Sequence, residues 1–173
     1  MACDIVTTVG SASADGYADI SDADSYHAAH TALDTWDAYS DEDQCRALKM
    51  ATRLLDYWYD WNGVAVNSTQ ALLWPRTGTY GPNGYLEPSD AIPTRIVHAT
   101  CELARQLLAA ATDRTADSEL ETSGVKSLQA GSVALEFRSV SAKVIPDAVA
   151  VMVSPYGTPR SRTGSASHVI LRG

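Results

Sequence analysis

The sequence has no long apolar run and no catalytic signature. None of its apolar stretches approaches the roughly 20 residues needed to cross a bilayer, and the first residues, Met1 to Asp4, lack the basic flank and apolar stretch of a signal peptide. Nucleophile elbows, phosphate-binding loops, dinucleotide fingerprints and His-Glu-x-x-His helices are also absent. The sequence therefore predicts a soluble, cytoplasmically made protein that is not an enzyme, has no cofactor and does not associate with membranes.

Cysteine is scarce, with three residues far apart at Cys3, Cys45 and Cys101. An odd number without a Cys-x-x-Cys pair predicts reduced thiols and offers no zinc or disulfide-cycling motif. His27 and His30 have a spacing that could place two imidazoles on one helix face for a metal. Because the sequence offers no matching further set of ligands, the favoured interpretation is a surface or core-edge histidine pair, with no metal.

Lysine and arginine are absent from residues 1–45, which contain ten acidic residues, and the whole chain has a net charge of −8. From Arg138 onward the sign reverses, because five basic residues and one acidic residue give that part a net charge of +4. Such asymmetry suits head-to-tail association or an acidic partner. The alternative is a solvated acidic surface with scattered arginines.

Hydrophobic periodicity and capping residues predict a mainly α fold. The expected elements, in chain order, are a short strand at 4–9, a helix capped by Ser21 or Asp22 and ending near Leu33, a helix from Ser40 to about Asn62-Gly63, a long loop over 64–91, a helix opened by Ile92-Pro93 and reaching Ala111, a β-hairpin at about 125–137, and a short helix over 145–153. These elements predict a small helical bundle with a short β-hairpin as one domain, 1–156, followed by an extended C-terminal tail, 157–173.

The second expected helix separates apolar from charged residues at three- and four-residue steps. Leu54 and Leu55 lie on its apolar stripe, and Met50, Tyr57 and Trp61 widen that stripe. The third expected helix buries Leu107 in the same way. The opposite face of the second helix carries charged side chains that we expect on the surface: Arg46, Lys49, Arg53, Asp56 and Asp60.

The sharpest local motif is Trp74-Pro75-Arg76, in the long loop. As a loop anchor, Trp74 would bury its ring over the long helices, Pro75 would fix the turn and Arg76 would pair with an acid. As a functional site, the same arginine would lie at an interface between subunits. The packing interpretation is favoured for Trp74, and the two interpretations stay open for Arg76.

Several segments of the chain together resemble those of a known protein family. They are Asp22 to Tyr26, Ala47-Leu48 to Gly63, Trp74-Pro75-Arg76, Ile92-Pro93, Glu102-Leu103-Ala104, and the hairpin from Val125 to Leu128 and Glu136-Phe137. Together they resemble the head-tail connector adaptors of long-tailed phages, a family whose sequences are sometimes labelled DnaT-like single-stranded DNA-binding proteins. The two labels imply different functions.

The adaptor label implies a structural virion protein in the phage neck, assembled in the host cytoplasm. It implies a ring of roughly twelve copies that joins the portal protein to a tail-side stopper or tail completion protein, with genomic DNA passing through the lumen without specific binding. The C-terminal tail would dock on the portal, because it combines a polar spacer with a β-prone end. Its docking residues are Arg160, Arg162, His168, Val169, Ile170, Leu171 and Arg172.

The alternative function is that of a replication-type single-stranded DNA-binding protein. The aromatic residues at 57–61 (Tyr57, Trp58, Tyr59 and Trp61) could stack on bases. Single-strand binders also need a basic groove, whereas Asp56 and Asp60 flank these aromatic residues and the chain is acidic. On this charge argument the sequence favours the adaptor.

Overall fold

The computed structural model describes residues 3–31, 36–112, 127–130, 133–136 and 144–160. Within these ranges the helices are α1 (Ile20–His27), α2 (Asp41–Trp58), α3 (Thr94–Thr112) and α5 (Asp147–Val153). The strands form three two-stranded antiparallel sheets: β1 (Tyr59–Trp61) with β6 (Gly157–Pro159), β2 (Val64–Ala65) with β3 (Arg76–Thr77), and β4 (Ser127–Ala130) with β5 (Val133–Glu136). The described residues therefore form a mixed α/β fold, and the predicted mainly α class holds only for its helical part.

Helix α2 begins where its sequence predicts and ends earlier. The Ser40 side chain accepts a hydrogen bond from the backbone N–H of Asp43, and three acidic residues follow in the first turn. At its other end the chain leaves the helix at Tyr59, whose backbone is extended. The predicted end near Asn62 is wrong because this segment pairs with the distant strand β6, a long-range contact that outweighs local helix propensity.

Helix α1 is shorter than predicted. Asp19 caps it through a reciprocal capping box with Asp22, and the helix ends at His27 instead of near Leu33. The predicted strand at 4–9 is not formed. Instead, the Val6 amide donates a hydrogen bond to the Asp15 carboxylate, and the Val6 carbonyl accepts one from the Asp15 amide. These two bonds fix the segment in a local loop.

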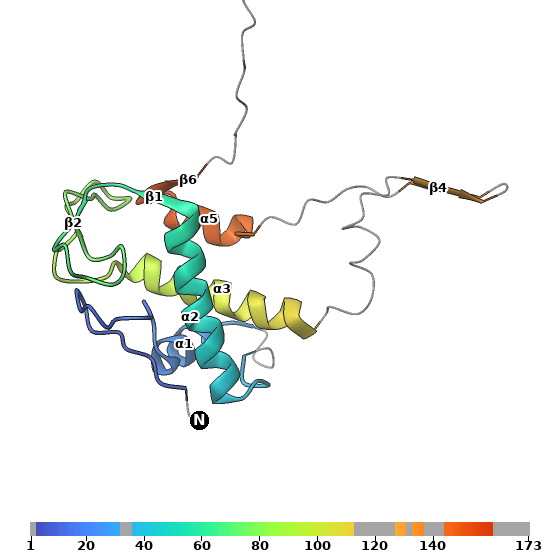
Figure 1. Cartoon of the computed structure of the whole chain (residues 1–173), viewed down its shortest axis with the longest axis horizontal. Coiled ribbons are helices and arrows are strands. Elements are labelled where there is room, and N and C mark those ends of the chain that lie inside the picture. Colours follow the sequence, from blue (N-terminus) through green and yellow to red (C-terminus); the bar gives the residue numbers. More distant parts are fainter. Residues whose placement is uncertain (1–2, 32–35, 113–126, 131–132, 137–143, 161–173) are drawn as a thin grey trace, which may run out of the picture.

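The core lies where α2 crosses α3, with α1 and α5 packed on α3 (Figure 1). The two long helices bury residues of the stripes that their periodicity predicts, whereas α1 buries Ala23 as predicted and His27 in place of the predicted Tyr26 and His30. The fully buried side chains include Leu48, Leu55, Ile96, Leu103, Val149 and Val153. Leu54 and Leu107 pack on this core but are only half-buried. Met50 and Tyr57 do not widen the stripe as expected, because both are exposed.

A disulfide joins Cys3 to Cys45, with the two Cα atoms 6.0 Å apart. It ties Cys3 to the N-terminal part of α2. The prediction of reduced thiols is therefore wrong for these two residues, and their separation of 42 residues explains why spacing alone did not pair them. Cys101 is free and buried, and burial raises the pKa of its thiol to about 12.

The C-terminal third contains two elements that the sequence predicts correctly. The hairpin is formed by β4 and β5, with Leu128 opposite Leu135. Helix α5 follows Pro146, which occupies the N-cap position. Every helix within the described ranges is too short or too polar to span a bilayer.

Candidate nucleic-acid interface

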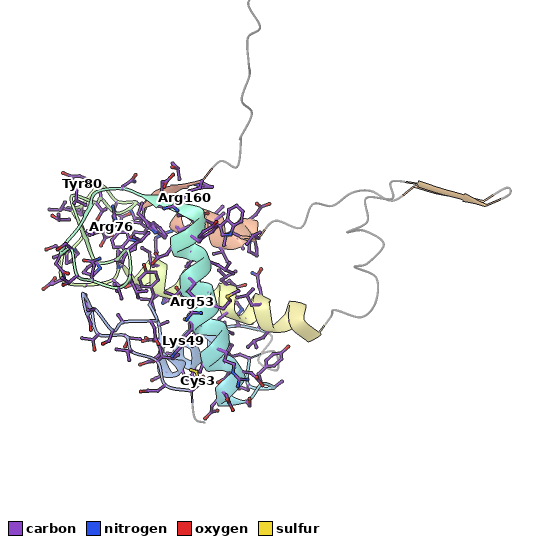
Figure 2. All side chains as sticks on the ribbon, in the orientation of Figure 1. Cys3, Lys49, Arg53, Arg76, Tyr80 and Arg160 are labelled. Carbon is purple, nitrogen blue, oxygen red and sulfur yellow. A yellow bond between two sulfur atoms is a disulfide. The ribbon has the colours of Figure 1, made fainter. Side chains whose placement is uncertain are left out.

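The outward side of α2 presents a row of exposed side chains. Arg46, Met50, Arg53 and Tyr57 follow one another at steps of four, three and four residues, which places them on one side of the helix. We call these four residues the α2 face. Figure 2 shows Lys49 and Arg53 along this helix and Arg160 beside its C-terminal end. Basic side chains and an aromatic ring are thus brought together along one helix.

The aromatic residues at 57–61 divide between the surface and the core. Tyr57 is 69% exposed, and its ring meets that of half-buried Trp58 edge-on, with ring centres 5.9 Å apart. Tyr59 and Trp61 are buried and stacked on each other. The chain passes from helix to strand at this point, so alternate residues turn inward. Tyr57 is therefore the ring of this set that a base can reach.

Most of the cations near the α2 face are paired. Arg46 lies near two acids of the first turn, and Lys49 contacts Asp15 at 2.6 Å. Arg53 is exposed and makes no ion pair within the described ranges. The row is consequently close to neutral in a chain whose net charge is −8, and Arg53 is the cation most available to a phosphate.

Strand β6 brings Arg160 to the end of α2. Its pairing with β1 places Thr158 opposite Asp60, and the amide of Arg160 donates to the carbonyl of Trp58 at 2.7 Å. The Arg160 guanidinium contacts the Asp60 carboxylate at 2.8 Å. One of the two acids expected to repel phosphate beside the aromatic residues is therefore neutralised.

The other flanking acid, Asp56, points into the protein. Its carboxylate accepts hydrogen bonds from the Tyr17 hydroxyl, from the Leu73 amide at 3.0 Å and from the Trp61 indole N–H at 3.2 Å. Burial raises the pKa of Asp56 despite these donors, which by themselves would lower it. The expectation that Asp56 is surface charge is wrong, because distant residues supply its partners, and the part of the charge argument that placed Asp56 beside a bound phosphate fails with it.

The Tyr17–Asp56 pair also holds the Trp74-Pro75-Arg76 motif. The Trp74 amide donates to the Tyr17 hydroxyl at 3.2 Å, and the Trp74–Pro75 peptide bond is cis. The Trp74 ring is 1% exposed and meets Trp61 and Tyr156 edge-on. Trp74 and Pro75 are thus interior residues of this chain, behind the end of α2.

Arg76 binds backbone carbonyls instead of the acid that the sequence suggests. Its guanidinium donates to the carbonyl oxygens of Trp61, Asn62, Gly63 and Leu73, at 2.6–3.3 Å. These contacts join the turn after β1 to the segment before Trp74. The geometry is that of a loop anchor, and it keeps β1 in the position from which it pairs with β6.

The structure describes only the first part of the predicted tail. Gly157 to Pro159 form β6 and pair with β1, and Arg160 pairs with Asp60, so these residues belong to the packed fold and not to an extended tail. The other tail residues proposed for docking lie outside the described ranges: Arg162, His168, Val169, Ile170, Leu171 and Arg172. The signal that the sequence analysis missed is the Arg53–Tyr57 pair, four residues apart on a helix.

The full chain, residues 1–173, matches the model of one protein family, described as "Putative DnaT-like ssDNA binding protein". Neither a curated protein nor a solved structure matches the chain. The family match overturns the predicted phage-neck function, including the adaptor ring, the portal and tail-side partners and the passage of DNA without specific binding. It agrees with the alternative function instead.

Proposed function

Since the chain belongs to this DnaT-like family over its whole length, we propose that it binds single-stranded DNA, without a catalytic step, through the α2 face. The observation that carries the proposal is the full-length family match. The geometry supports it by identifying a surface with the required chemistry. Tyr57 supplies an exposed ring for stacking, and Arg53, one helical turn away, supplies an unpaired cation for the backbone.

Binding at this face is sequence-tolerant, because every base presents a π-face to an aromatic ring. It is also weak and depends on salt. Lys49 and Arg160 must share their charge between a phosphate and their carboxylate partners, Asp15 and Asp60. A few phosphate contacts to a single strand give a slope of about −0.7 per contact in log K against log salt.

Strand β6 adds one cation at the same place, because it brings Arg160 to the Trp58 carbonyl at the end of α2. Residues from Arg138 onward have a net charge of +4 in the sequence, and Arg160 is the basic residue of that segment within the described ranges. Opposite charges raise the rate of encounter at low ionic strength. Of the acidic first 45 residues, Asp15 lies near enough to interact electrostatically with Arg53, and its ion pair with Lys49 partly offsets its charge.

Fluorescence anisotropy with a labelled oligothymidine at low salt tests the proposal. The full chain should bind, and the double variant Arg53→Ala/Tyr57→Ala should bind at least about fivefold more weakly, since one stacked base contributes about 1–3 kcal/mol. The matched control is Tyr85→Ala/Arg95→Ala, which removes an exposed tyrosine and an exposed arginine elsewhere. Equal losses in the two double variants would reject the α2 face, and no binding by the unmodified chain would reject the function.

A further inference from the structure

A second cluster of reactive side chains joins α1 to α3, away from the residues used above. His27 and His30 come from the end of α1 and the turn after it, and Glu102 comes from the middle of α3. One potential ligand atom from each of these three side chains lies within 4.8 Å of the other two. We propose that this cluster is a binding site for a divalent transition-metal ion of the Zn²⁺ type.

The state of His27 suits a ligand. The residue is 5% exposed, and its Nε2 lies 3.3 Å from the Cys101 carbonyl oxygen. When Nε2–H donates to that oxygen, Nδ1 keeps a lone pair, and Nδ1 is buried with no hydrogen-bond partner among the described residues. A histidine held through one nitrogen by a backbone carbonyl, with the other nitrogen free, is the usual arrangement of a metal ligand.

Glu102 is held in position by its neighbours. Arg105 and Gln106 both donate to its Oε1, at 2.5 and 2.7 Å. Its Oε2 accepts from Arg105 Nε at 3.3 Å and lies 3.7 Å from Nε2 of His30. Burial alone would raise the pKa of Glu102, but the hydrogen bonds from Arg105 and Gln106 lower it below its ordinary value. Because Arg105 partly neutralises the Glu102 carboxylate, we expect micromolar rather than tighter affinity for Zn²⁺.

Only a small movement would complete the site. Ligand atoms about 2.0–2.2 Å from Zn²⁺ in tetrahedral geometry are roughly 3.4 Å apart, so atoms that now lie within 4.8 Å of one another must close by up to about 1.4 Å. The half-buried His30 ring provides this movement, since it borders an open cavity of about 590 Å³ that also gives solvent access. Two histidines and one carboxylate leave a fourth position for water. The ion would then fasten α1 to α3.

The experiment is a Zn²⁺ titration of the metal-free full chain by calorimetry, followed by Co²⁺ absorption spectroscopy. We expect one ion per chain, a higher melting temperature with Zn²⁺, and a visible Co²⁺ spectrum without thiolate charge transfer. The substitutions His30→Ala and Glu102→Gln should each weaken binding at least tenfold. His30 is part-exposed and Glu102→Gln keeps the side-chain shape, so both variants avoid emptying the buried His27 position.

The matched control is His98→Ala, which removes a part-exposed histidine that borders the same cavity but lies outside the cluster of three. Its Zn²⁺ affinity should equal that of the unmodified chain. The proposal is overturned if the unmodified chain shows no saturable binding, if His30→Ala binds as tightly as the unmodified chain, if the His98→Ala loss matches that of His30→Ala, or if a thiolate band identifies cysteine as a ligand.

Discussion

Replacing Asp56 by alanine should destabilise the protein by about 3 kcal/mol. The substitution leaves three donors without an acceptor: the Tyr17 hydroxyl, the Leu73 amide and the Trp61 indole N–H. An unsatisfied buried donor costs about 1–3 kcal/mol. We take about 1 kcal/mol for each of the three donors. This is the lower end of the range, because water can reach the part-buried Leu73 amide and because removing a buried carboxylate saves its desolvation cost.

The assay is urea-induced unfolding of the full chain, followed by tryptophan fluorescence and circular dichroism. Asp60→Ala is the matched control, since this residue lies four positions further along the chain, is exposed and makes one ion pair, with Arg160. Exposed ion pairs contribute roughly 0–1 kcal/mol. If the two variants differ by less than about 1 kcal/mol, Asp56 is not the buried acceptor described here.

Three further predictions concern stability. Leu55→Ala should cost about 2–5 kcal/mol and Met50→Ala under about 0.5 kcal/mol in urea unfolding, because only Leu55 lies in the core. Arg76→Lys should cost about 1–3 kcal/mol by the same assay, since one ammonium cannot reach the four carbonyls that the guanidinium joins; an unchanged midpoint would contradict the anchor. Burial raises the pKa of Asp56 in the folded protein, so the stabilisation that its protonated carboxyl contributes to folding is fully present below the unfolded-state pKa of about 3.9. This stabilisation is lost as the pH rises through the folded-state pKa. In urea unfolding at a series of pH values, the midpoint of the unmodified chain relative to that of Asp56→Asn should therefore fall between these two pKa values. A difference between the two midpoints that does not change with pH would contradict the raised pKa.

Local signals predicted where the elements lie. The Ser40 cap and the acidic turn after it placed the start of α2, and Pro146 placed the start of α5. The hairpin was predictable from alternation around Ala130-Gly131. In these cases the energy that decides the structure comes from residues within a few positions of one another, which is why a sequence pattern suffices.

Long-range contacts decided the features that the sequence did not predict. Helix α2 ends early because β1 pairs with β6, nearly a hundred residues away. Asp56 turns inward because Tyr17, 39 residues earlier, and Leu73 provide donors that no helical period reveals. Formal charge in a sequence does not distinguish a buried or paired carboxylate from an exposed one, so it could not reveal that Asp56 is buried and Asp60 is paired with Arg160.

The most direct test of single-stranded DNA binding at the α2 face is photo-crosslinking of the full chain to a bromodeoxyuridine-substituted oligonucleotide at low salt, with the adducts mapped by peptide mass spectrometry. A base stacked on the exposed Tyr57 ring should give adducts concentrated on the peptide that contains Tyr57 and Trp58. Arg53→Ala should reduce their yield, and unlabelled single-stranded DNA should compete more effectively than duplex. Adducts that map elsewhere, or the absence of any adduct under these conditions, would contradict the proposed function at this face.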